Sequence, residues 1–208
     1  MIKAVIFDMD GVLIEAKEWH YEALNKSLNL FGFNIDRYDH LTKFDGLPTK
    51  DKLNILSAEY SLPLELHSFI NEMKQQYTMD IVHAKCKPMF IHEYALSKLK
   101  QQGYKLAVAS NSIKNTVITM MEKASLDSYL NVMLSNQDVT KGKPDPEIYI
   151  KTIEILQLTP EECLIVEDNE NGIKAAKASG AHVLVVSDVT DVNYRNITDF
   201  INNINLEG

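Results

Sequence analysis

Residues 4–12 read AVIFDMDGV and place two aspartates, Asp8 and Asp10, directly after a short apolar run. A short run without polar alternation is typical of a strand that is covered on both faces of a parallel sheet. Side chains two positions apart on an extended chain point the same way, so the two carboxylates are expected to lie together. Gly11 then allows the backbone to turn sharply away from the strand. Since catalytic groups in parallel α/β sheets lie beyond the carboxyl ends of strands, this stretch predicts a site at the end of the first strand.

Similar apolar runs alternate with helical patterns through most of the chain. We expect strands at Ala4–Phe7, Leu106–Ala109, Val132–Leu134, Leu164–Val166 and Val183–Val186, and helices over residues 88–102, 112–125, 146–157 and 170–179. Asp145 followed by Pro146 is typical of a helix start, with the aspartate as N-cap. The alternation predicts an α/β protein with a Rossmann-like parallel sheet and helices on both faces.

The stretch from residue 16 to 81 breaks this alternation because it contains helical patterns and no convincing strand. Its helical spacings are Leu24, Leu28 and Phe31, then Leu53, Leu56 and Tyr60, then Ile70, Met73 and Tyr77. We therefore expect an all-helical subdomain at residues 16–81, inserted into a core formed by residues 1–15 and 82–208. The asparagine-rich tail from Asn193 is expected to end in a short helix.

The composition fits a globular protein, because 45% of the 208 residues are hydrophobic and 24% are charged. The formal net charge is −8, and a negative field of this kind repels nucleic acids and anionic membranes. A small phosphorylated substrate stays open, since a metal ion and a lysine reverse the field locally. We expect neither nucleic acid nor a membrane as a partner.

The two cysteines, Cys86 and Cys163, lie far apart and outside any Cys-x-x-Cys spacing, which disfavours a disulfide or a zinc site. The first residues are not typical of a secretory signal, and no apolar run approaches the length that spans a membrane. We predict a cytoplasmic protein. We also predict a monomer, because no interface pattern stands out in the sequence.

Three more segments place reactive side chains at or near the ends of strands. They are Ser110-Asn111-Ser112, Lys143 in the loop 141–146, and Glu167-Asp168-Asn169. Taken singly, each has an ordinary explanation: helix caps for the serines and acids, and a solvated charge for the lysine. For an isolated Asp-x-Asp-Gly we would favour a turn by roughly two to one. Together they supply a nucleophile, oxygen ligands for Mg²⁺, a hydroxyl and a cation, which phosphoryl transfer requires.

These motifs, in this order, resemble the four motifs of the haloacid dehalogenase (HAD) superfamily over essentially the whole chain. The nearest subgroup is that of the β-phosphoglucomutase-like phosphatases, in which the helical insert forms a cap. The segments that carry the closer likeness are Trp19-His20, Phe44-Asp45-Gly46-Leu47-Pro48, Lys143-Pro144-Asp145-Pro146-Glu147-Ile148-Tyr149 and Glu167-Asp168-Asn169. The resemblance implies a Mg²⁺-dependent phosphoric monoester hydrolase.

The resemblance also implies roles for the motif residues. Asp8 would be the nucleophile that becomes an aspartyl phosphate, and Asp10 would be the general acid and then the general base. The phosphoryl oxygens would be held by Ser110, Asn111 and Lys143. Mg²⁺ would be bound by Asp8, the backbone carbonyl of Asp10 and Asp168, with Glu167 in or just behind that set of ligands.

The cap is expected to contact the rest of the substrate through His20, Thr49, Lys50 and Lys74. Mutase relatives carry a histidine at the place of His20, although a surface helix histidine fits the residue equally well. For the two lysines, the ordinary alternative is a solvated charge. The arginine with which mutases hold a distal phosphate is missing, because Pro48-Thr49-Lys50 fill that stretch and the only arginines are Arg37 and Arg195.

The sequence leaves a phosphatase for a small metabolite, with a sugar phosphate as the leading substrate class, as the main interpretation. A phosphosugar mutase of the β-phosphoglucomutase type is the alternative, weakened by the missing arginine. Two further departures matter: Glu15-Ala16 replaces the usual start of the cap, and the presence of Asp10 disfavours dehalogenase chemistry. A receiver-like signalling module is disfavoured because receivers lack the helical insert. An inactive binding protein is disfavoured because every catalytic position is filled.

Overall fold

The computed structural model describes residues 1–44 and 47–207, which form two compact units. The larger unit begins with Met1–Glu15 and resumes at Cys86, and the smaller unit is Ala16–Lys85. The boundary that we expected near residue 82 falls inside helix α4, which runs from His67 to Lys85.

The larger unit is built on one five-stranded parallel sheet with the strand order β3-β2-β1-β4-β5. Its strands are β1 (Ala4–Phe7), β2 (Lys105–Ala109), β3 (Val132–Leu134), β4 (Cys163–Glu167) and β5 (His182–Val185). Phe7 at the end of β1 pairs with Val108 of β2 and with Val166 of β4. The chain therefore leaves the three central strands at the same level, and the predicted α/β fold is confirmed.

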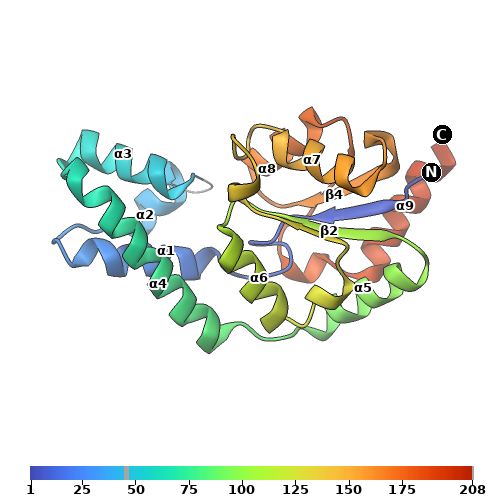
Figure 1. Ribbon diagram of the computed structural model, residues 1–208, viewed down its shortest axis with the longest axis horizontal. Coiled ribbons are helices and arrows are strands. Elements are labelled where there is room, and N and C mark those ends of the chain that lie inside the picture. Colours follow the sequence, from blue (N-terminus) through green and yellow to red (C-terminus); the bar gives the residue numbers. More distant parts are fainter. Residues whose placement is uncertain (45–46, 208) are drawn as a thin grey trace. The chain divides into compact units, whose positions relative to one another are not determined.

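Helices cover both faces of this sheet (Figure 1). On one face lie α7 (Glu147–Leu156) and α8 (Glu170–Ala178), and on the other lie α5 (Phe90–Gln101), α6 (Lys114–Lys123) and α9 (Tyr194–Glu207). Short 3₁₀ turns connect them at Asp127–Tyr129, Asn136–Asp138, Pro160–Glu162 and Val189–Asp191. Every residue of β1 is buried, which explains why its sequence is apolar without alternation.

Two details of the larger unit differ from the sequence expectations. Pro146, and not Asp145, occupies the N-cap position of α7, although the Asp145 carboxylate still accepts a hydrogen bond from the backbone N–H of Glu147 at 3.1 Å. The tail forms a helix of 14 residues, longer than expected. It returns the end of the chain to its start, where the backbone N–H of Ile2 donates to the Asn205 side chain at 3.1 Å (Figure 1).

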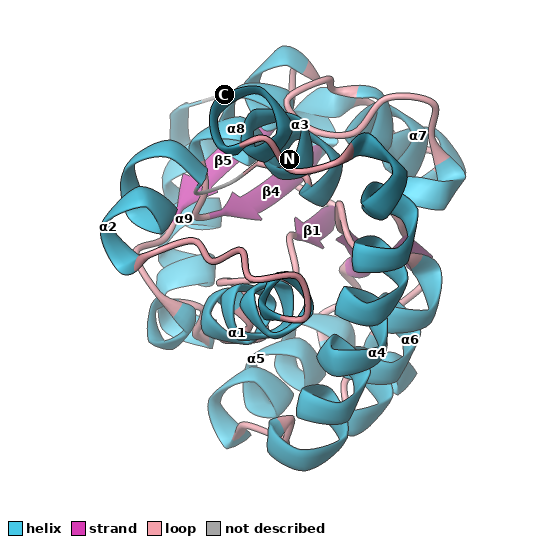
Figure 2. Cartoon of the chain, turned by 90° about the vertical axis from the view of Figure 1, so that its left-hand side faces the viewer, coloured by secondary structure: helices cyan, strands magenta, loops and turns pink. Residues whose placement is uncertain are grey.

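The described residues of the smaller unit form helices and no strand (Figure 2). They are α1 (Lys17–Asn29), α2 (Arg37–Asp39), a π-helical turn (His40–Phe44), α3 (Thr49–Tyr60), a 3₁₀ turn (Leu64–Leu66) and α4 (His67–Lys85). Most of the expected apolar positions lie in one buried cluster, among them Leu24, Leu53 and Ile70. Phe31 and Tyr60 do not, because they lie beyond or at the end of their helices and stay exposed. Met73 and Tyr77 lie outside the cluster as well and are half-buried.

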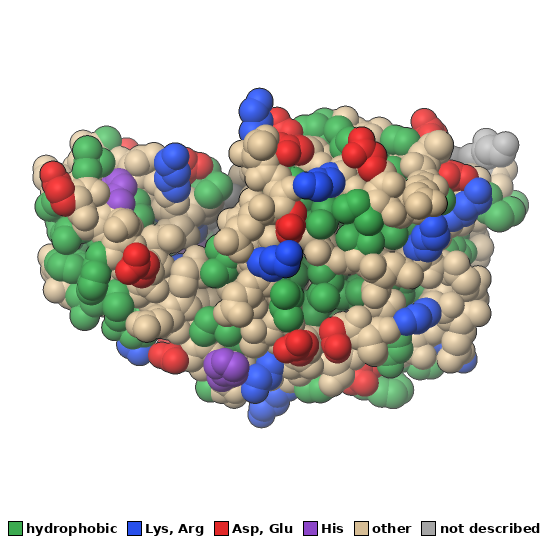
Figure 3. Space-filling model, viewed as in Figure 1, with side chains coloured by type: hydrophobic (Ala, Val, Ile, Leu, Met, Phe, Trp, Pro, Cys, Tyr) green, Lys and Arg blue, Asp and Glu red, His purple; other side chains and the backbone are tan. Residues whose placement is uncertain are grey.

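The surface carries both signs of charge. On the face drawn in Figure 3, acidic and basic side chains are interspersed. Within the described residues, no helix combines the length and the apolar character that crossing a membrane requires.

Candidate active site

The strand ends of the larger unit bring together the side chains that the motifs predicted. Asp8 follows β1, Ser110 follows β2 and Glu167 ends β4. The backbone N–H of Asp8 donates to the carbonyl of Val166 at 3.0 Å, and that of Ser110 donates to the carbonyl of Leu134 at 3.1 Å. The hydrogen bonds of the sheet thus continue one residue beyond β1 and β2 and fix the backbone positions of Asp8 and Ser110.

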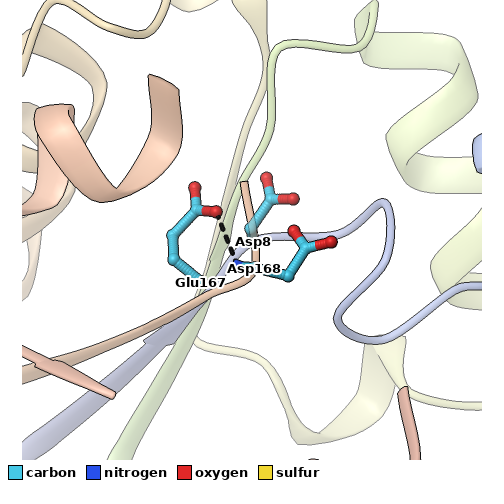
Figure 4. Close-up of side chains that lie close together, drawn as sticks. All are labelled: Asp8, Glu167 and Asp168. Carbon is cyan, nitrogen blue, oxygen red and sulfur yellow. Dashed lines mark hydrogen bonds between the residues drawn. The ribbon is translucent and has the colours of Figure 1, made fainter. Parts of the chain in front are cut away.

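Three carboxylates form an acidic cluster at this edge. One oxygen from each of Asp8, Glu167 and Asp168 lies within 4.8 Å of the others, and Figure 4 shows these side chains together beyond the strand ends. Asp8 and Glu167 are buried, whereas Asp168 is half-buried. Carboxylate oxygens at this spacing repel one another and are the ligands that Mg²⁺ prefers.

Lys143 lies inside this cluster and is not a solvated charge. Its ammonium group donates to an oxygen of Asp8 at 2.6 Å and to Oε1 of Glu167 at 2.7 Å, and the residue is only 5% exposed. Burial opposes the charge of this lysine, but the two carboxylates outweigh that effect and raise its pKa. The ammonium form is therefore the stable one.

The surroundings of Asp8 fit a bound cation. Burial raises the pKa of Asp8 to about 8, helped by the neighbouring charges of Glu167 and Asp10 and opposed by Lys143. With protein groups alone, much of this carboxyl would hold a proton at neutral pH, and a protonated carboxyl is a poor nucleophile. The all-oxygen donor set and this raised pKa both fit a divalent cation such as Mg²⁺.

Glu167 is held by four hydrogen-bond donors. Its Oε1 accepts from Lys143 and from the Tyr149 hydroxyl, the latter at 2.6 Å. Its Oε2 accepts from the backbone N–H groups of Asp168 at 3.0 Å, the dashed line of Figure 4, and of Asn169 at 3.3 Å. Because a carboxylate offers about four acceptor positions, the protein itself already uses those of Glu167.

Gly172 in α8 makes room for this arrangement. A Cβ atom on Gly172 would lie 1.8 Å from Oε1 of Glu167, closer than any real contact. Burial and the charge of Glu167 together raise the pKa of Tyr149 well above its usual value, so its phenol stays a donor. Neither residue had a role in the sequence analysis, although Tyr149 belongs to a quoted motif.

Asn111 acts on the loop that carries Lys143. Its side-chain amide donates to the carbonyl of Lys143 at 3.2 Å, and its Oδ1 accepts from the backbone N–H of Lys143 at 2.9 Å. A Cβ atom on Gly142 would approach that oxygen to 2.8 Å. In this arrangement the side-chain amide of Asn111 is hydrogen-bonded to the backbone of Lys143. The expected contact of Asn111 with a phosphoryl group stays a prediction.

Ser112 connects the second motif to Asp10. Its hydroxyl donates to Oδ2 of Asp10 at 3.0 Å, and its backbone N–H donates to the hydroxyl oxygen of the buried Ser110 at 3.0 Å. Gly11 has a φ of 89°, the conformation that the expected sharp turn requires. The sequence analysis quoted Ser112 without assigning it. Nothing in the sequence singled out its contact with Asp10.

Two of the expected cap contacts meet within the smaller unit. The Lys74 ammonium lies 3.2 Å from Nδ1 of His20, and Lys74 is only 8% exposed. The alternative of a solvated charge is therefore wrong for Lys74. Lys50 is exposed in the first turn of α3, and Thr49 begins that helix, so their expected contacts with the substrate stay predictions. The segment quoted at positions 45 and 46 lies outside the described residues.

Comparison with known proteins agrees with the motifs. The family model described as haloacid dehalogenase-like hydrolase matches residues 5–186. A phosphorylated carbohydrates phosphatase of Thermotoga maritima is 31% identical over 86% of this chain and 82% of its own length. A phosphoglycolate phosphatase of Aquifex aeolicus is 29% identical over the same shares, 86% and 82%. The β-phosphoglucomutase structure from Clostridium difficile superposes with a TM-score of 0.83 at 22% identity, covering 99% of this chain and all of that one, which supports the fold.

Proposed function

The chain belongs to the haloacid dehalogenase-like hydrolase family, and on that basis we propose that it is a Mg²⁺-dependent phosphatase for a small phosphorylated metabolite. The observation that carries the proposal is the position of Lys143 between Asp8 and Glu167, with Asp168 in the same cluster. A nucleophile, a fixed cation and oxygen ligands for a metal thus lie within one buried group.

The reaction uses two aspartates in turn. A carboxylate oxygen of Asp8 attacks phosphorus, and the bond between phosphorus and the ester oxygen breaks while Asp10 gives that oxygen a proton. Asp10 then takes a proton from water, which attacks the aspartyl phosphate, releases inorganic phosphate and restores the Asp8 carboxylate. The hydrogen bond from Ser112 to Asp10 supports this role because it holds the acid in one orientation.

Asp8, the carbonyl of Asp10 and Asp168 would hold Mg²⁺. Glu167 would stand behind them, because its oxygens already accept from four protein donors. When bound, the ion offsets the charges of the nucleophile and of the incoming phosphate dianion. The protein residues set its place and orient the two aspartates.

Lys143 and Ser110 would hold the phosphoryl oxygens. The ammonium group has three donors, and two of them point to Asp8 and Glu167. The third is then directed at an oxygen of the transferred group, where it stabilises charge that develops in the transition state. Asn111 would contribute by fixing the backbone of Lys143.

A sugar phosphate is the substrate class that we propose, supported by the relative named a phosphorylated carbohydrates phosphatase. The relative named a phosphoglycolate phosphatase makes a small phosphorylated acid the next compound to test. Contacts of the substrate with His20, Thr49, Lys50 and Lys74, a cytoplasmic location and a monomeric state stay predictions.

Phosphate release with and without Mg²⁺ tests the proposal. The panel contains sugar phosphates, phosphoglycolate and p-nitrophenyl phosphate, and Asp8→Asn runs beside the wild-type protein. We expect Mg²⁺-dependent release that the substitution abolishes. Absence of release from every compound would overturn hydrolysis, and isomerisation of a hexose 1-phosphate with a bisphosphate primer would then establish the mutase.

A further inference from the structure

We infer that Tyr149 is a positioning residue of this site, which orients Glu167 through its hydroxyl and supports Lys143 through its ring. The inference rests on the proposed function. Tyr149 is fully buried in the first turn of α7, and its hydroxyl donates to Oε1 of Glu167 at 2.6 Å. The ammonium of Lys143 lies 4.7 Å from the centre of its ring.

The hydroxyl of Tyr149 acts on the orientation of Glu167. Oε1 accepts from Tyr149 and Lys143, while Oε2 accepts from backbone N–H groups of the next two residues. Without the hydroxyl, Oε1 keeps only the lysine, so the buried carboxylate loses one of the donors that offset its desolvation. Three donors still hold Glu167, but Oε1 is then held by Lys143 alone and is less tightly oriented toward the other two acids of the cluster.

The ring of Tyr149 acts on Lys143. An aromatic face attracts a cation at this distance, and the attraction is stronger where water is excluded. Removing the ring would let Lys143 move away from the line between Asp8 and Glu167.

The start of α7 holds the rest of the same loop. The carboxylate of Glu147 accepts from the backbone N–H and the hydroxyl of Thr140, at 2.8 and 2.7 Å, and from the backbone N–H of Lys141 at 2.9 Å. One turn of helix thus fixes the loop backbone through Glu147 and the ammonium of Lys143 through Tyr149. This explains how a residue on a loop keeps a catalytic position.

The two roles of Tyr149 predict separate effects. Tyr149→Phe keeps the ring and removes the hydroxyl, so it should weaken Mg²⁺ binding while substrate KM at saturating Mg²⁺ changes little. Tyr149→Leu also removes the ring and should in addition raise KM and lower kcat through Lys143. The matched control is Thr152→Val, which removes a buried hydroxyl from the same helix, where it donates only to the Ile148 carbonyl at 2.7 Å among the contacts described.

Isothermal titration with Mg²⁺ alone, together with steady-state kinetics and thermal unfolding, tests the inference. We expect Tyr149→Phe to raise the dissociation constant of Mg²⁺ several-fold, less than the about 10- to 100-fold that is usual for losing a residue directly behind the metal ligands, here Glu167. Thr152→Val should leave that constant unchanged. A Tyr149→Phe protein with the wild-type constant and wild-type kcat would overturn the inference, and so would an equal loss in Thr152→Val.

The same measurements distinguish a failure of the proposed phosphatase function from a failure of the role of Tyr149. A wild-type protein that neither binds Mg²⁺ nor releases phosphate overturns both proposals. A wild-type protein that does both, with a Tyr149→Phe variant that matches it, overturns only the role of Tyr149. Should Tyr149→Leu not fold, the Phe variant decides by itself, because it keeps the packing volume.

Discussion

Asp8→Asn should make the protein more stable in the presence of EDTA, by an amount that grows with pH. The folded protein holds a proton on Asp8 up to a pKa of about 8, whereas the unfolded chain releases it near 3.8. Between these values the folded state binds more protons, so the stability of the wild-type protein falls as pH rises through this window. Asparagine has no charge to bury and its carbonyl still accepts from Lys143, so the variant lacks this penalty.

The size of the effect follows from the same two values. A tenfold change in proton affinity corresponds to about 1.4 kcal/mol, so the shift of Asp8 sets a ceiling of about 6 kcal/mol. Local relaxation and entry of water reduce such burial costs, and we expect a gain of about 1–3 kcal/mol at pH 8. Lys143 keeps its proton throughout this range because its pKa is raised, so it contributes no slope of its own.

Urea unfolding in EDTA at pH 5, 6, 7 and 8 measures this prediction. The quantity to compare is the difference in the free energy of unfolding between variant and wild type, in which contributions common to both proteins, such as that of the buried His92, cancel. The difference should increase steadily with pH. A difference that is constant with pH, or that falls, would refute the reasoning about the buried Asp8 carboxyl.

Three further substitutions test separate contacts of the site. Gly172→Ala should displace Glu167, since the added Cβ would lie 1.8 Å from its Oε1. We expect Mg²⁺ binding to become about 10- to 100-fold weaker by titration calorimetry, and unchanged binding would contradict this. Ser112→Ala removes the hydrogen-bond donor to Asp10. We expect kcat to fall about tenfold with KM unchanged, which is less than the roughly 10²–10⁴-fold lost when the general acid itself is removed. A change confined to KM would refute the role of Ser112 in orienting Asp10. Lys143→Met should lower kcat about 10²- to 10³-fold, because the cation stabilises charge in the transition state, and wild-type kcat would argue against that contact.

The sheet and the motif residues could be predicted because parallel strands end at one edge. Short apolar runs showed where the chain ends each strand, and this placed Asp8, Ser110 and Glu167 together before any contact was known. The contacts of Tyr149 and Ser112 could not be predicted in this way. The contact of Ser112 joins the segments that follow β2 and β1, and that of Tyr149 joins α7 and β4. No local sequence pattern encodes the direction that a side chain takes between two such elements.

The burial of Lys74 was missed for a different reason, because the signal was present. The sequence analysis followed Ile70 to Met73 and Tyr77, a spacing of three and seven residues. The buried stripe of α4 instead runs through Ile70, Lys74 and Thr78, four residues apart. Both stripes fit a helix, and the polar character of Lys74 hid the correct one.

Proton release on Mg²⁺ binding should follow from the charges of the cluster. Three carboxylates and one ammonium leave a net charge of −2 when all are ionised, and a proton on Asp8 is one way to lower it. A divalent cation is the other, and it leaves Asp8 ionised and able to attack. Because the two exclude each other, Mg²⁺ binding at pH 7 should displace close to one proton per site, and affinity should rise with pH up to about 8. Titration calorimetry in buffers of different ionisation enthalpy counts that proton, and Asp8→Asn should release none. Equal heats in all buffers for the wild-type protein would show that Asp8 is already ionised and that burial does not control its charge.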